Sequence, residues 1–509
     1  MKRVLISVSD KTGIIEFAKE LVNLKYEIIS TGGTKKVLEE AGIKTVGISE
    51  VTNFPEIMDG RVKTLHPNVH GGLLCVRSNE EHMKTLEENR IELIDMLIVN
   101  LYPFKNTLEK KGVIHDELIE NIDIGGPSML RSAAKNYEFV TVVVDPKDYG
   151  KVLLEIARKG DTELLTREKF AAKVFRHTAS YDSIIADYLT EKTGEEFPES
   201  ITVSYEKVQD LRYGENPHQR AGFYKNVRTG YSVVQGKQLH GKELSYNNIQ
   251  DMNSALEILK EFSSPTVVAV KHMNPCGVGS GVNILEAWER AHKSDSISIF
   301  GGIVVFNRDV TKEIAEKISE LFLEIVVAPG YESEAFEIIS KKKNIRIIKL
   351  NMNLKLKNRR KLISVMDGVL IQEIDLKSIT EEELVCVTDR KPTIKELEDL
   401  MFSWKVVKHV KSNAIVIAKG DQTVGIGAGQ MNRVGAAKIA LEQAGEGCVG
   451  AVMASDAFFP MSDTVEMAAK YGVRAIIQPG GSIKDTLSID ECNKNGIAMV
   501  FTKIRHFKH

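Results

Sequence analysis

Short apolar runs alternate with amphipathic segments along the first third of the chain. Strands are predicted for the β-branched runs at residues 3–8, 26–30, 96–99 and 139–144. Helical periodicity marks residues 12–24, directly between the first two of these runs. Strands that alternate with helices imply a mostly parallel sheet with helices on both faces. The pattern therefore predicts an α/β domain.

A helical stretch and a polar segment follow this domain. Residues 162–192 show helical periodicity without a strand signal, and residues 193–200 have the composition of a linker. The α/β alternation resumes near residue 232, and a basic, helix-poor segment interrupts it at residues 341–361, which favours two C-terminal subdomains. The predicted domains are residues 1–197, with a core of 1–146 and a helical extension, and residues 205–509, with subdomains of about 205–365 and 366–509.

Composition excludes several classes of protein. The 509 residues suffice for roughly three domain-sized units. Their 68 basic and 70 acidic residues are balanced, which argues against a general nucleic-acid binder. No run reaches the ~18 apolar residues of a membrane span, and the first residues lead straight into a predicted strand. We therefore expect neither a membrane protein nor a signal peptide.

Cysteine usage points to a reducing compartment. The five cysteines are odd in number and far apart in the sequence, and no CxxC pair occurs. This spacing disfavours a disulfide framework or a cysteine-rich zinc site. The expected location is the cytoplasm.

Two loops of the N-terminal domain have the composition of phosphate sites. Thr31-Gly32-Gly33-Thr34 lies between a predicted strand and a predicted helix, where backbone amides, hydroxyls and the helix N-terminus favour an anion. Ser9-Asp10-Lys11-Thr12-Gly13 has the same setting. Many tight turns share this composition, so one loop alone is weak evidence. Two loops in one sheet, with Arg61-Val62-Lys63-Thr64 nearby, favour a phosphate site.

A carboxylate and a lysine bracket a short predicted helix farther along the same domain. Asp123-Ile124-Gly125-Gly126 precedes this helix, and Lys135 is predicted on the next element. The carboxylate near backbone amides and the lysine are suited to proton transfer. The alternative is an ordinary surface ion pair.

The third candidate is the pair Lys271-His272, which ends a predicted strand at residues 265–270. Asn274-Pro275 predicts a turn immediately after it. Strand ends in α/β sheets are where ligands are usually bound. A cation beside a titratable imidazole suits proton removal from a weak nucleophile while charge develops on a leaving group. The alternative is a solvated lysine and a histidine hydrogen-bonded at a turn.

The motifs occur in an order that resembles one family over nearly the whole chain. This family joins inosine monophosphate (IMP) cyclohydrolase to aminoimidazole carboxamide ribonucleotide (AICAR) transformylase in purine biosynthesis. The cyclohydrolase half is matched by residues 7–13, 60–66, 100–104 and 123–126. The transformylase half is matched by residues 271–277, 300–302, 328–331, 411–414, 425–430 and 455–460.

The resemblance implies a fold for each half. It implies an N-terminal methylglyoxal-synthase-like domain with a parallel sheet and a C-terminal half of two cytidine-deaminase-like α/β subdomains. Zinc deaminases need a P-C-x-x-C pair, and Pro275-Cys276 lacks the second cysteine at Gly279. We therefore expect no catalytic metal, and a structural monovalent cation stays open.

The resemblance also implies two reactions and a partner. A formyl group would pass from the co-substrate 10-formyltetrahydrofolate to the 5-amino group of AICAR, and the product formyl-AICAR would close to IMP with loss of water. The family pairs through its C-terminal half, so a homodimer with a shared transformylase site is expected.

The resemblance assigns the cyclohydrolase residues as follows. The catalytic residues are Lys63, Tyr102, Asp123 and Lys135. The nucleotide-binding residues are Ser9, Asp10, Lys11, Thr31, Gly32, Gly33, Thr34, Arg61, Val62, Lys63, Thr64, Asn100, Asp123, Ile124 and Gly125.

The transformylase residues are assigned in the same way. The catalytic residues are Lys271, His272 and Asn413. The residues expected to bind the nucleotide are Arg212, Tyr213, His272, Gly301, Glu324, Asn413, Arg433, Phe458 and Arg505, and those on the folate side are Val434, Asp463, Gly480 and Gly481. Glu324 stands where some members of the family have Asp, so the carboxylate is retained.

Two other functions fit parts of the sequence. A lone lyase of the methylglyoxal-synthase kind would account for the N-terminal domain, but it would leave residues 123–126 and the C-terminal half unexplained. A nucleotide-sensing regulatory module would need no catalytic groups. The two constellations above count against it, and measurable turnover would decide.

Overall fold

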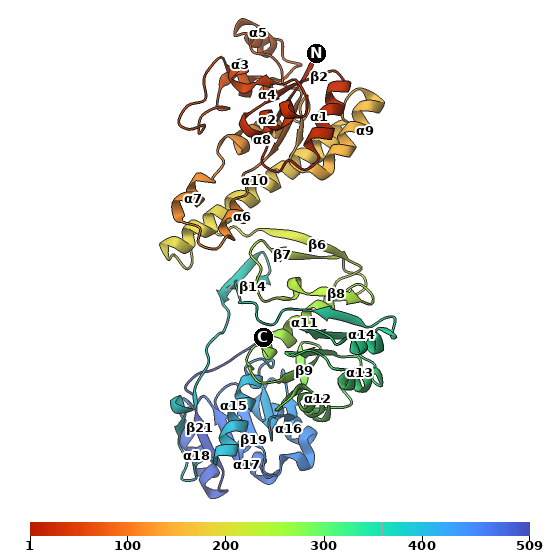
Figure 1. The fold of residues 1–509 in the computed structure, drawn as a ribbon. Coiled ribbons are helices and arrows are strands. Elements are labelled where there is room, and N and C mark those ends of the chain that lie inside the picture. The colour runs from red at the N-terminus through yellow and green to blue at the C-terminus, as the bar shows by residue number, and fades with distance from the viewer. Residues whose placement is uncertain (358–359) are drawn as a thin grey trace. The chain divides into compact units, whose positions relative to one another are not determined.

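The computed structural model describes residues 1–357 and 360–509 (Figure 1). The chain divides into two compact units, residues 1–205 and residues 206–509, and each is described separately. Within the described ranges, no helix combines the length and the apolar character that a membrane span requires.

Unit 1 is built on a five-stranded sheet whose strands are all parallel. Its order is β3-β2-β1-β4-β5. The sheet confirms the parallel α/β prediction, and its strand residues are largely buried because helices cover both faces. The strands are β1 (Lys2–Val8), β2 (Tyr26–Ser30), β3 (Val46–Gly47), β4 (Met96–Asn100) and β5 (Thr141–Val143).

The helices of unit 1 form two packed groups. α1, α2 and α9 form one, and α4, α8 and α10 form the other. Right-handed crossovers explain this, because the chain winds outward from β1 to β3 and then from β4 to β5 on the opposite side. The helices are α1 (Ile14–Asn23), α2 (Gly32–Glu40), α3 (Ile48–Thr52), α4 (Pro67–Leu74), α5 (Glu80–Glu88), α6 (Phe104–Leu108), α7 (His115–Glu120), α8 (Gly125–Lys135), α9 (Tyr149–Lys159) and α10 (Leu164–Thr193).

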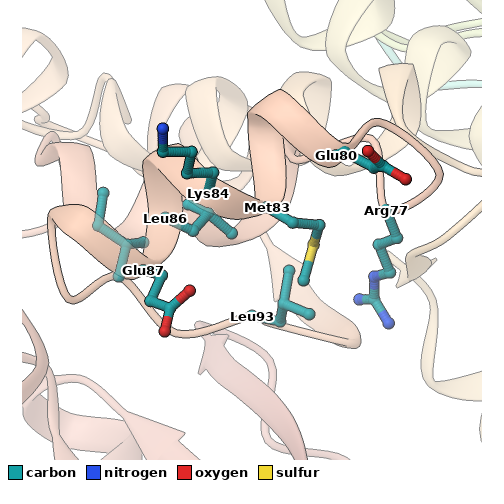
Figure 2. A pocket seen from close by; sticks show the side chains of 8 residues that line it. Arg77, Glu80, Met83, Lys84, Leu86, Glu87 and Leu93 are labelled. Atoms are coloured by element: carbon teal, nitrogen blue, oxygen red, sulfur yellow. The ribbon is translucent and has the colours of Figure 1, made fainter.

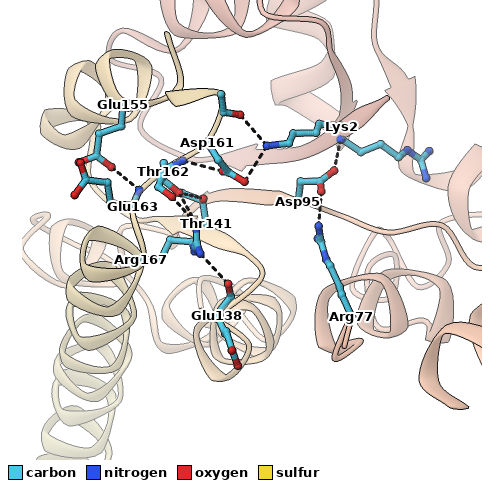
Figure 3. Close-up of polar contacts among 12 residues, drawn as sticks. Lys2, Arg77, Asp95, Glu138, Thr141, Glu155, Asp161, Thr162, Glu163 and Arg167 are labelled. Carbon is cyan, nitrogen blue, oxygen red and sulfur yellow. Dashed lines mark hydrogen bonds and ion pairs between the residues drawn. The ribbon is translucent and has the colours of Figure 1, made fainter. Parts of the chain in front are cut away.

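Polar contacts tie together the amino-terminal edge of this sheet (Figure 3). Lys2 at the start of β1 pairs with Asp161 at 2.9 Å, and Arg77 pairs with Asp95, just before β4, at 2.7 Å. The carboxyl-terminal edge lies at the other end of the strands. Because the strand order reverses between β1 and β4, that edge is the expected ligand-binding position.

Unit 2 contains two mixed six-stranded sheets. The first has the order β10-β9-β11-β12-β13-β8, with β8 (Lys237–His240), β9 (Thr266–Lys271), β10 (Asn274–Ser280), β11 (Ile303–Phe306), β12 (Ile325–Ala328) and β13 (Arg346–Lys349). The second has the order β16-β21-β20-β19-β17-β18, with β16 (Val385–Cys386), β17 (Ile415–Ala418), β18 (Thr423–Gly427), β19 (Val452–Ser455), β20 (Ala475–Gln478) and β21 (Ala498–Phe501).

Two short hairpins and eight helices accompany these sheets in the described ranges. The hairpins are β6 (Tyr205–Leu211) with β7 (Ala221–Asn226), and β14 (Arg360–Val365) with β15 (Gly368–Glu373). The helices are α11 (Tyr246–Leu259), α12 (Ile284–Ser294), α13 (Lys312–Ser319), α14 (Ser333–Ser340), α15 (Ile394–Val407), α16 (Arg433–Ala444), α17 (Asp463–Lys470) and α18 (Asp485–Lys494).

The two sheets share one plan. Each has a strand, a helix, an antiparallel hairpin, and then three alternations of helix and strand, in the same chain order. In each sheet, the first strand of the hairpin, β9 or β17, also runs antiparallel to its other neighbour, β11 or β19. One face of each sheet contributes to a shared apolar core, and the other face of each sheet has a separate apolar cluster.

The predicted turn at Asn274-Pro275 is wrong, and part of the predicted basic segment lies outside the residues that the structure describes. Asn274-Pro275 does not form the turn, because it begins β10, and the turn consists of His272 and Met273, with φ of 54° and 62°. A two-residue hairpin with positive φ at both positions matches the twist of its strands. Within the basic segment 341–361, Asn358 and Arg359 lie outside the described residues.

Candidate active sites

Asn100, the last residue of β4, holds the first loop at the carboxyl edge of unit 1. Its side-chain oxygen accepts hydrogen bonds from the amides of Ser9, at 2.6 Å, and Asp10, at 2.8 Å. Its Nδ2 donates to the Asp10 carbonyl at 3.0 Å. These amides are therefore already used. The side chains of Ser9 and Lys11 remain candidates, and Lys11 Nζ also donates to the carbonyls of Val8, at 3.4 Å, and Ser9, at 3.5 Å.

The second loop contributes amides rather than hydroxyls. The Thr34 hydroxyl donates to the carbonyl of Val8 at 3.0 Å, and the Thr31 hydroxyl lies 2.7 Å from Ser7 Oγ. Both hydroxyls predicted for phosphate binding thus bind to β1, Thr31 from the residue after β2 and Thr34 from α2. The first amides of α2, at Gly32 and Gly33, have no partner within the helix and carry its positive dipole end to the carboxyl edge.

Asp123 lies directly before α8 and is held on both sides. Its Oδ1 accepts from the Gly126 amide at 2.8 Å, and its own amide donates to the Tyr181 hydroxyl at 2.9 Å. Burial raises the pKa of Asp123, and backbone donors at Gly126 and Tyr102 and the charge of Lys63 oppose that shift. Lys63, the Tyr102 backbone and Asp123 therefore share one environment.

The segment before α4 also reaches this helix start. A Cβ atom on Gly125 would lie 2.5 Å from Thr64 Oγ1, so only glycine permits this approach. Arg61 forms an exposed ion pair with Glu120, and Val62 pairs with Ile57. Ile124 is exposed between Asp123 and the helix. The structure thus brings most predicted cyclohydrolase residues to one edge of the sheet.

Lys135 is placed differently. It is not on the element after α8, because it is the last residue of α8 itself. Eleven helical residues separate the two ends of α8 by about 16 Å. Lys135 lines a separate cavity of about 620 Å³ with Arg131 and Phe175, so this chain does not bring it to Asp123.

The raised pKa of Asp123 predicts a pH dependence. As the pH falls, this carboxylate takes up its proton above the value of about 3.9 that an ordinary aspartate shows. If the carboxylate is the reactive form, the cyclohydrolase activity that the sequence resemblance implies should decline with an acid limb above that value. A pH profile of kcat/KM for formyl-AICAR checks this, and an acid limb at or below an ordinary aspartate pKa would contradict it.

In unit 2, Asp251 of α11 supports the turn that carries His272. Its carboxylate accepts from the Met273 amide at 2.6 Å and from the His272 amide at 3.3 Å. Burial raises the pKa of Asp251, while these two bonds and the nearby His272 lower it. Lys271 donates from Nζ to the Phe300 carbonyl at 2.9 Å, and the His272 side chain is exposed.

Glu324 lies beside this turn because β9 runs antiparallel to β11 and β12 follows in parallel. The end of β9 and the start of β12 therefore lie at the same edge of the sheet, with the start of β11 between them. Asn248 Nδ2 donates to Glu324 Oε2 at 2.7 Å, and Arg346 Nη1 lies 3.4 Å from the same oxygen. The charge of Arg212 depresses the pKa of Arg346 beyond what burial does, which places Arg212 in the same cluster.

Arg212 and Gly301 complete this first group of transformylase residues. The Arg212 guanidinium lies 4.8 Å from the centre of the Tyr213 ring and donates to its hydroxyl at 3.1 Å. Gly301 has φ of 74°, and its amide donates to Phe322. We call Arg212, Tyr213, Lys271, His272, Gly301 and Glu324 the first half-site.

A second group lies at the start of β17 and the ends of β19 and β20. Arg433 is only 5% exposed, forms an ion pair with the buried Asp456, and donates to the Ala414 carbonyl at 3.0 Å. Asn413 donates from Nδ2 to the Gln430 carbonyl at 2.8 Å. Arg433 thus supports the peptide that follows Asn413, and its own contacts are internal.

The other predicted residues of this group follow the same edge. Phe458 is 41% exposed after β19, Asp463 begins α17, and Gly480 and Gly481 follow β20 with φ of 71° and 98°. Arg505, after β21, lies 4.3 Å from the centre of the Phe507 ring. We call Asn413, Arg433, Val434, Phe458, Asp463, Gly480, Gly481 and Arg505 the second half-site.

A hydrogen bond connects the segments that carry the two half-sites. The amide of Lys411, two residues before Asn413, donates to Asn274 Oδ1 at 3.1 Å. From that contact the first half-site extends over β9, β11 and β12, and the second extends over β17, β19 and β20. The two half-sites extend in opposite directions because the sheets adjoin along their edge strands, β10 of the first sheet and β18 of the second.

Among residues 1–357 and 360–509, no cluster of three or more His, Cys, Asp or Glu side chains is arranged to hold a metal ion. Burial raises the pKa of the Cys276 thiol to about 12, so it stays protonated. A cavity of about 550 Å³ beside α5 includes Arg77 (Figure 2), whose partner Asp95 lies at the amino edge of the sheet.

Sequence reasoning missed four supporting residues. Asp251 holds the His272 turn, Asn248 and Arg346 hold Glu324, and Asp456 holds Arg433. Asp456 lies within the family motif at residues 455–460, but it was not among the predicted site residues. The other three have no local signal, because their partners are distant in the sequence.

These features define an α/β protein with two separate polar sites, as expected of a bifunctional enzyme. A family model described as "AICARFT/IMPCHase bienzyme" matches residues 133–443, and an "MGS-like domain" model matches residues 13–128. The chain belongs to the AICARFT/IMPCHase bienzyme family. It has AICAR formyltransferase and IMP cyclohydrolase activities of purine biosynthesis, and the formyltransferase activity implies a formyltetrahydrofolate co-substrate.

Full-length relatives agree with the family model. The chain is 60% identical over 100% of both chains to the "Bifunctional purine biosynthesis protein PurH" of Bacillus cytotoxicus, and equally to that of Oceanobacillus iheyensis. The crystal structure of ForH matches 37% of this chain and 97% of its own, with 33% identity and a TM-score of 0.35. Membership in a bienzyme family confirms the predicted function over the lone lyase and the regulatory module.

Proposed function

We propose that unit 1 closes the ring and that unit 2 transfers the formyl group. The observation that carries this assignment is the separation of the polar groups, since Asp123 lies in unit 1 and the His272 turn in unit 2. Their chemistry also differs. A buried carboxylate near backbone donors suits proton exchange during ring closure, and an exposed Lys–His pair suits transfer between two substrates.

For ring closure, the carboxamide nitrogen of formyl-AICAR attacks the formyl carbon of the same molecule. Both ends are tethered, so orientation supplies much of the rate. Asp123 takes the amide proton, and Lys63 with the Tyr102 side chain and nearby amides stabilises the developing oxyanion. The α2 amides at Gly32 and Gly33 are placed to bind the phosphate. Asp123 returns that proton to the oxyanion, and the resulting hydroxyl leaves as water with the proton of the 5-formamido nitrogen, which forms the new C=N bond of the ring.

For formyl transfer, the 5-amino group of AICAR attacks the formyl carbon of 10-formyltetrahydrofolate. This amine is a poor nucleophile because its lone pair is delocalised into the imidazole. His272 takes its proton, and Lys271 protonates the departing folate nitrogen. Asn413 holds the carboxamide as donor and acceptor. Val434, Asp463, Gly480 and Gly481 are assigned to the folate side.

A homodimer with shared transformylase sites is part of this proposal. The outer members of the half-sites, Glu324 before β12 and Gly480 after β20, are separated by several strands, on the order of 30 Å at ~4.8 Å per strand. One nucleotide does not span that distance. Exposed apolar side chains also accompany both half-sites, including Phe300, Phe322, Met431 and Ile483. A second copy that covers them would join opposite half-sites.

Subunit mixing tests the shared site. Inactive His272→Ala protein mixed with inactive Asn413→Ala protein is expected to regain part of the formyl transfer, because a mixed dimer then holds one site with neither substitution. Each variant mixed with itself is the control. If transfer stays at the level of the separate variants after demonstrated subunit exchange, both half-sites of a working site come from one chain.

Unit 1 is expected to work alone. A fragment of residues 1–205 should cyclise formyl-AICAR at a rate close to that of the full chain and transfer no formyl group, because its sheet and the Asp123 site are complete within it. IMP formation measures the first activity, and tetrahydrofolate release measures the second. Cooperative thermal unfolding shows that the fragment is folded, and a folded but inactive fragment would refute the assignment.

A further inference from the structure

The two sheets of unit 2 repeat each other down to individual contacts. Lys271 at the end of β9 donates from Nζ to the Phe300 carbonyl at 2.9 Å. Lys419, which follows β17, donates from Nζ to the Val449 carbonyl at 2.7 Å. Both lysines stand where the first hairpin strand ends and the hairpin turn begins. The second repeat therefore offers an internal comparison for the first.

The support of the turn is also repeated. Asp251 on α11 accepts from the Met273 amide at 2.6 Å, and Asp399 on α15 accepts from the Asp421 amide at 3.0 Å. Gly301 and Gly450, at the start of the following strands, have φ of 74° and 76°. The second turn carries Gly420 where the first carries His272. A contact present in both repeats belongs to the scaffold.

One polar contact of the first repeat has no counterpart in the second. Glu324 immediately precedes β12, and Arg474 holds the same place before β20. Asn248 is the third residue of α11, and Glu396 is the third residue of α15. In the second repeat Glu396 pairs with Arg390, which donates to the Arg474 carbonyl at 2.9 Å, so this contact holds the backbone of residue 474 and not its side chain. In the first repeat Asn248 donates directly to the Glu324 side chain at 2.7 Å.

Asn248 performs two tasks with its two side-chain atoms. Its Oδ1 accepts from the Ser245 amide at 3.1 Å and closes the cap of α11, as Glu396 does for α15. Its Nδ2 is the donor to Glu324 Oε2. Asn248 is 5% exposed, while the Glu324 side chain is 40% exposed. The cap belongs to the repeated scaffold, and the bond to Glu324 does not.

We infer that Asn248 is a positioning residue for AICAR binding, acting through Glu324. This inference rests on the proposed function of unit 2. Asn248 and Arg346 hold one carboxylate oxygen, Oε2, from the protein side. Oε1 is then presented to an N–H or O–H donor of the nucleotide. A carboxylate fixed by a charge-assisted contact binds such a donor more tightly than a mobile one.

Asn248→Asp separates the two tasks. Aspartate keeps an acceptor for the Ser245 amide but removes the Nδ2 donor and places a second carboxylate against Glu324. We expect KM for AICAR to rise about 10- to 100-fold, the usual effect of losing one hydrogen bond to a charged group. The kcat for transfer and the KM for 10-formyltetrahydrofolate should stay within about threefold of wild type, because neither involves Glu324.

Two further variants distinguish positioning from a structural role. Ser245→Ala removes the reciprocal cap bond, in which the Asn248 amide donates to Ser245 Oγ at 3.2 Å, and leaves the Glu324 contact intact. It should lower thermal stability without raising KM for AICAR. Adding Glu324→Gln to Asn248→Asp re-forms the bond with donor and acceptor exchanged, and it should recover part of the lost affinity.

The outcomes separate this inference from the proposed function. The positioning role is wrong if Asn248→Asp has the KM for AICAR of the wild-type enzyme. It is also wrong if Ser245→Ala raises the KM for AICAR as much as Asn248→Asp does. If the His272→Ala variant transfers formyl groups as fast as the wild-type enzyme, the assignment of the site itself is wrong. A raised KM in Asn248→Asp with partial recovery in the double variant supports the inference.

Discussion

His272→Ala is expected to lower formyl transfer about 10²- to 10⁴-fold, the usual contribution of a positioned acid or base. The imidazole is exposed at a turn whose backbone Asp251 holds, so alanine removes the base without removing that support. Cyclisation should remain near wild type because unit 1 contains its own site. Tetrahydrofolate release and IMP formation from formyl-AICAR measure the two steps separately.

Met273→Leu is the matched control for this variant. Met273 shares the turn and its positive φ but carries no titratable group. It should keep transfer within a few fold of wild type, and its thermal unfolding should resemble that of His272→Ala. Equal losses of transfer in both variants would show that the turn, rather than the imidazole, limits the reaction.

Asp123→Asn should reduce cyclisation by about 10²- to 10⁴-fold. Asparagine keeps an acceptor for the Gly126 amide but cannot take up a proton from the carboxamide. Formyl transfer should continue and formyl-AICAR should accumulate, since the transfer site lies in unit 2. Product analysis by chromatography measures the ratio of formyl-AICAR to IMP.

An exposed aspartate of the same unit provides the control. Asp116 lies in the first turn of α7, and Asp116→Asn should leave both activities unchanged. Retention of full cyclisation in Asp123→Asn would remove this carboxylate from the mechanism. Lys135→Ala adds a second comparison, because Lys135 lies at the far end of α8 and should affect cyclisation less than Asp123→Asn does.

The sequence by itself determined the α/β class and the position of most strands. Short apolar, β-branched runs bounded by turn residues favour buried strands, and β2 has the bounds that its pattern predicts, residues 26–30. Motif order was also sufficient for the family, which the full-length relatives confirm. The positions of the strands depend on residues that are close together in the sequence, and the family depends on the order of the motifs. Both can be read directly from the sequence.

Local pattern was weaker where the backbone conformation depends on pairing. Asn274-Pro275 has the composition of a turn, but it begins β10 because the tight pairing of β9 with β10 places the turn at His272 and Met273. Likewise, α8 continues to Lys135, which separates that lysine from Asp123. Register and helix length are set by tertiary packing, and residue composition constrains them poorly.

Only the tertiary structure decided which polar groups share a site. Glu324 receives Asn248 from α11 and Arg346 from β13, and the antiparallel β9 brings all three beside the His272 turn. The repeated contacts of Lys271 and Lys419 are equally hidden, because their acceptors, the carbonyls of Phe300 and Val449, are 29 and 30 residues away in the chain. Hydrogen bonds across a sheet edge connect residues far apart in the chain, so their partners emerge only when strand order and direction are known.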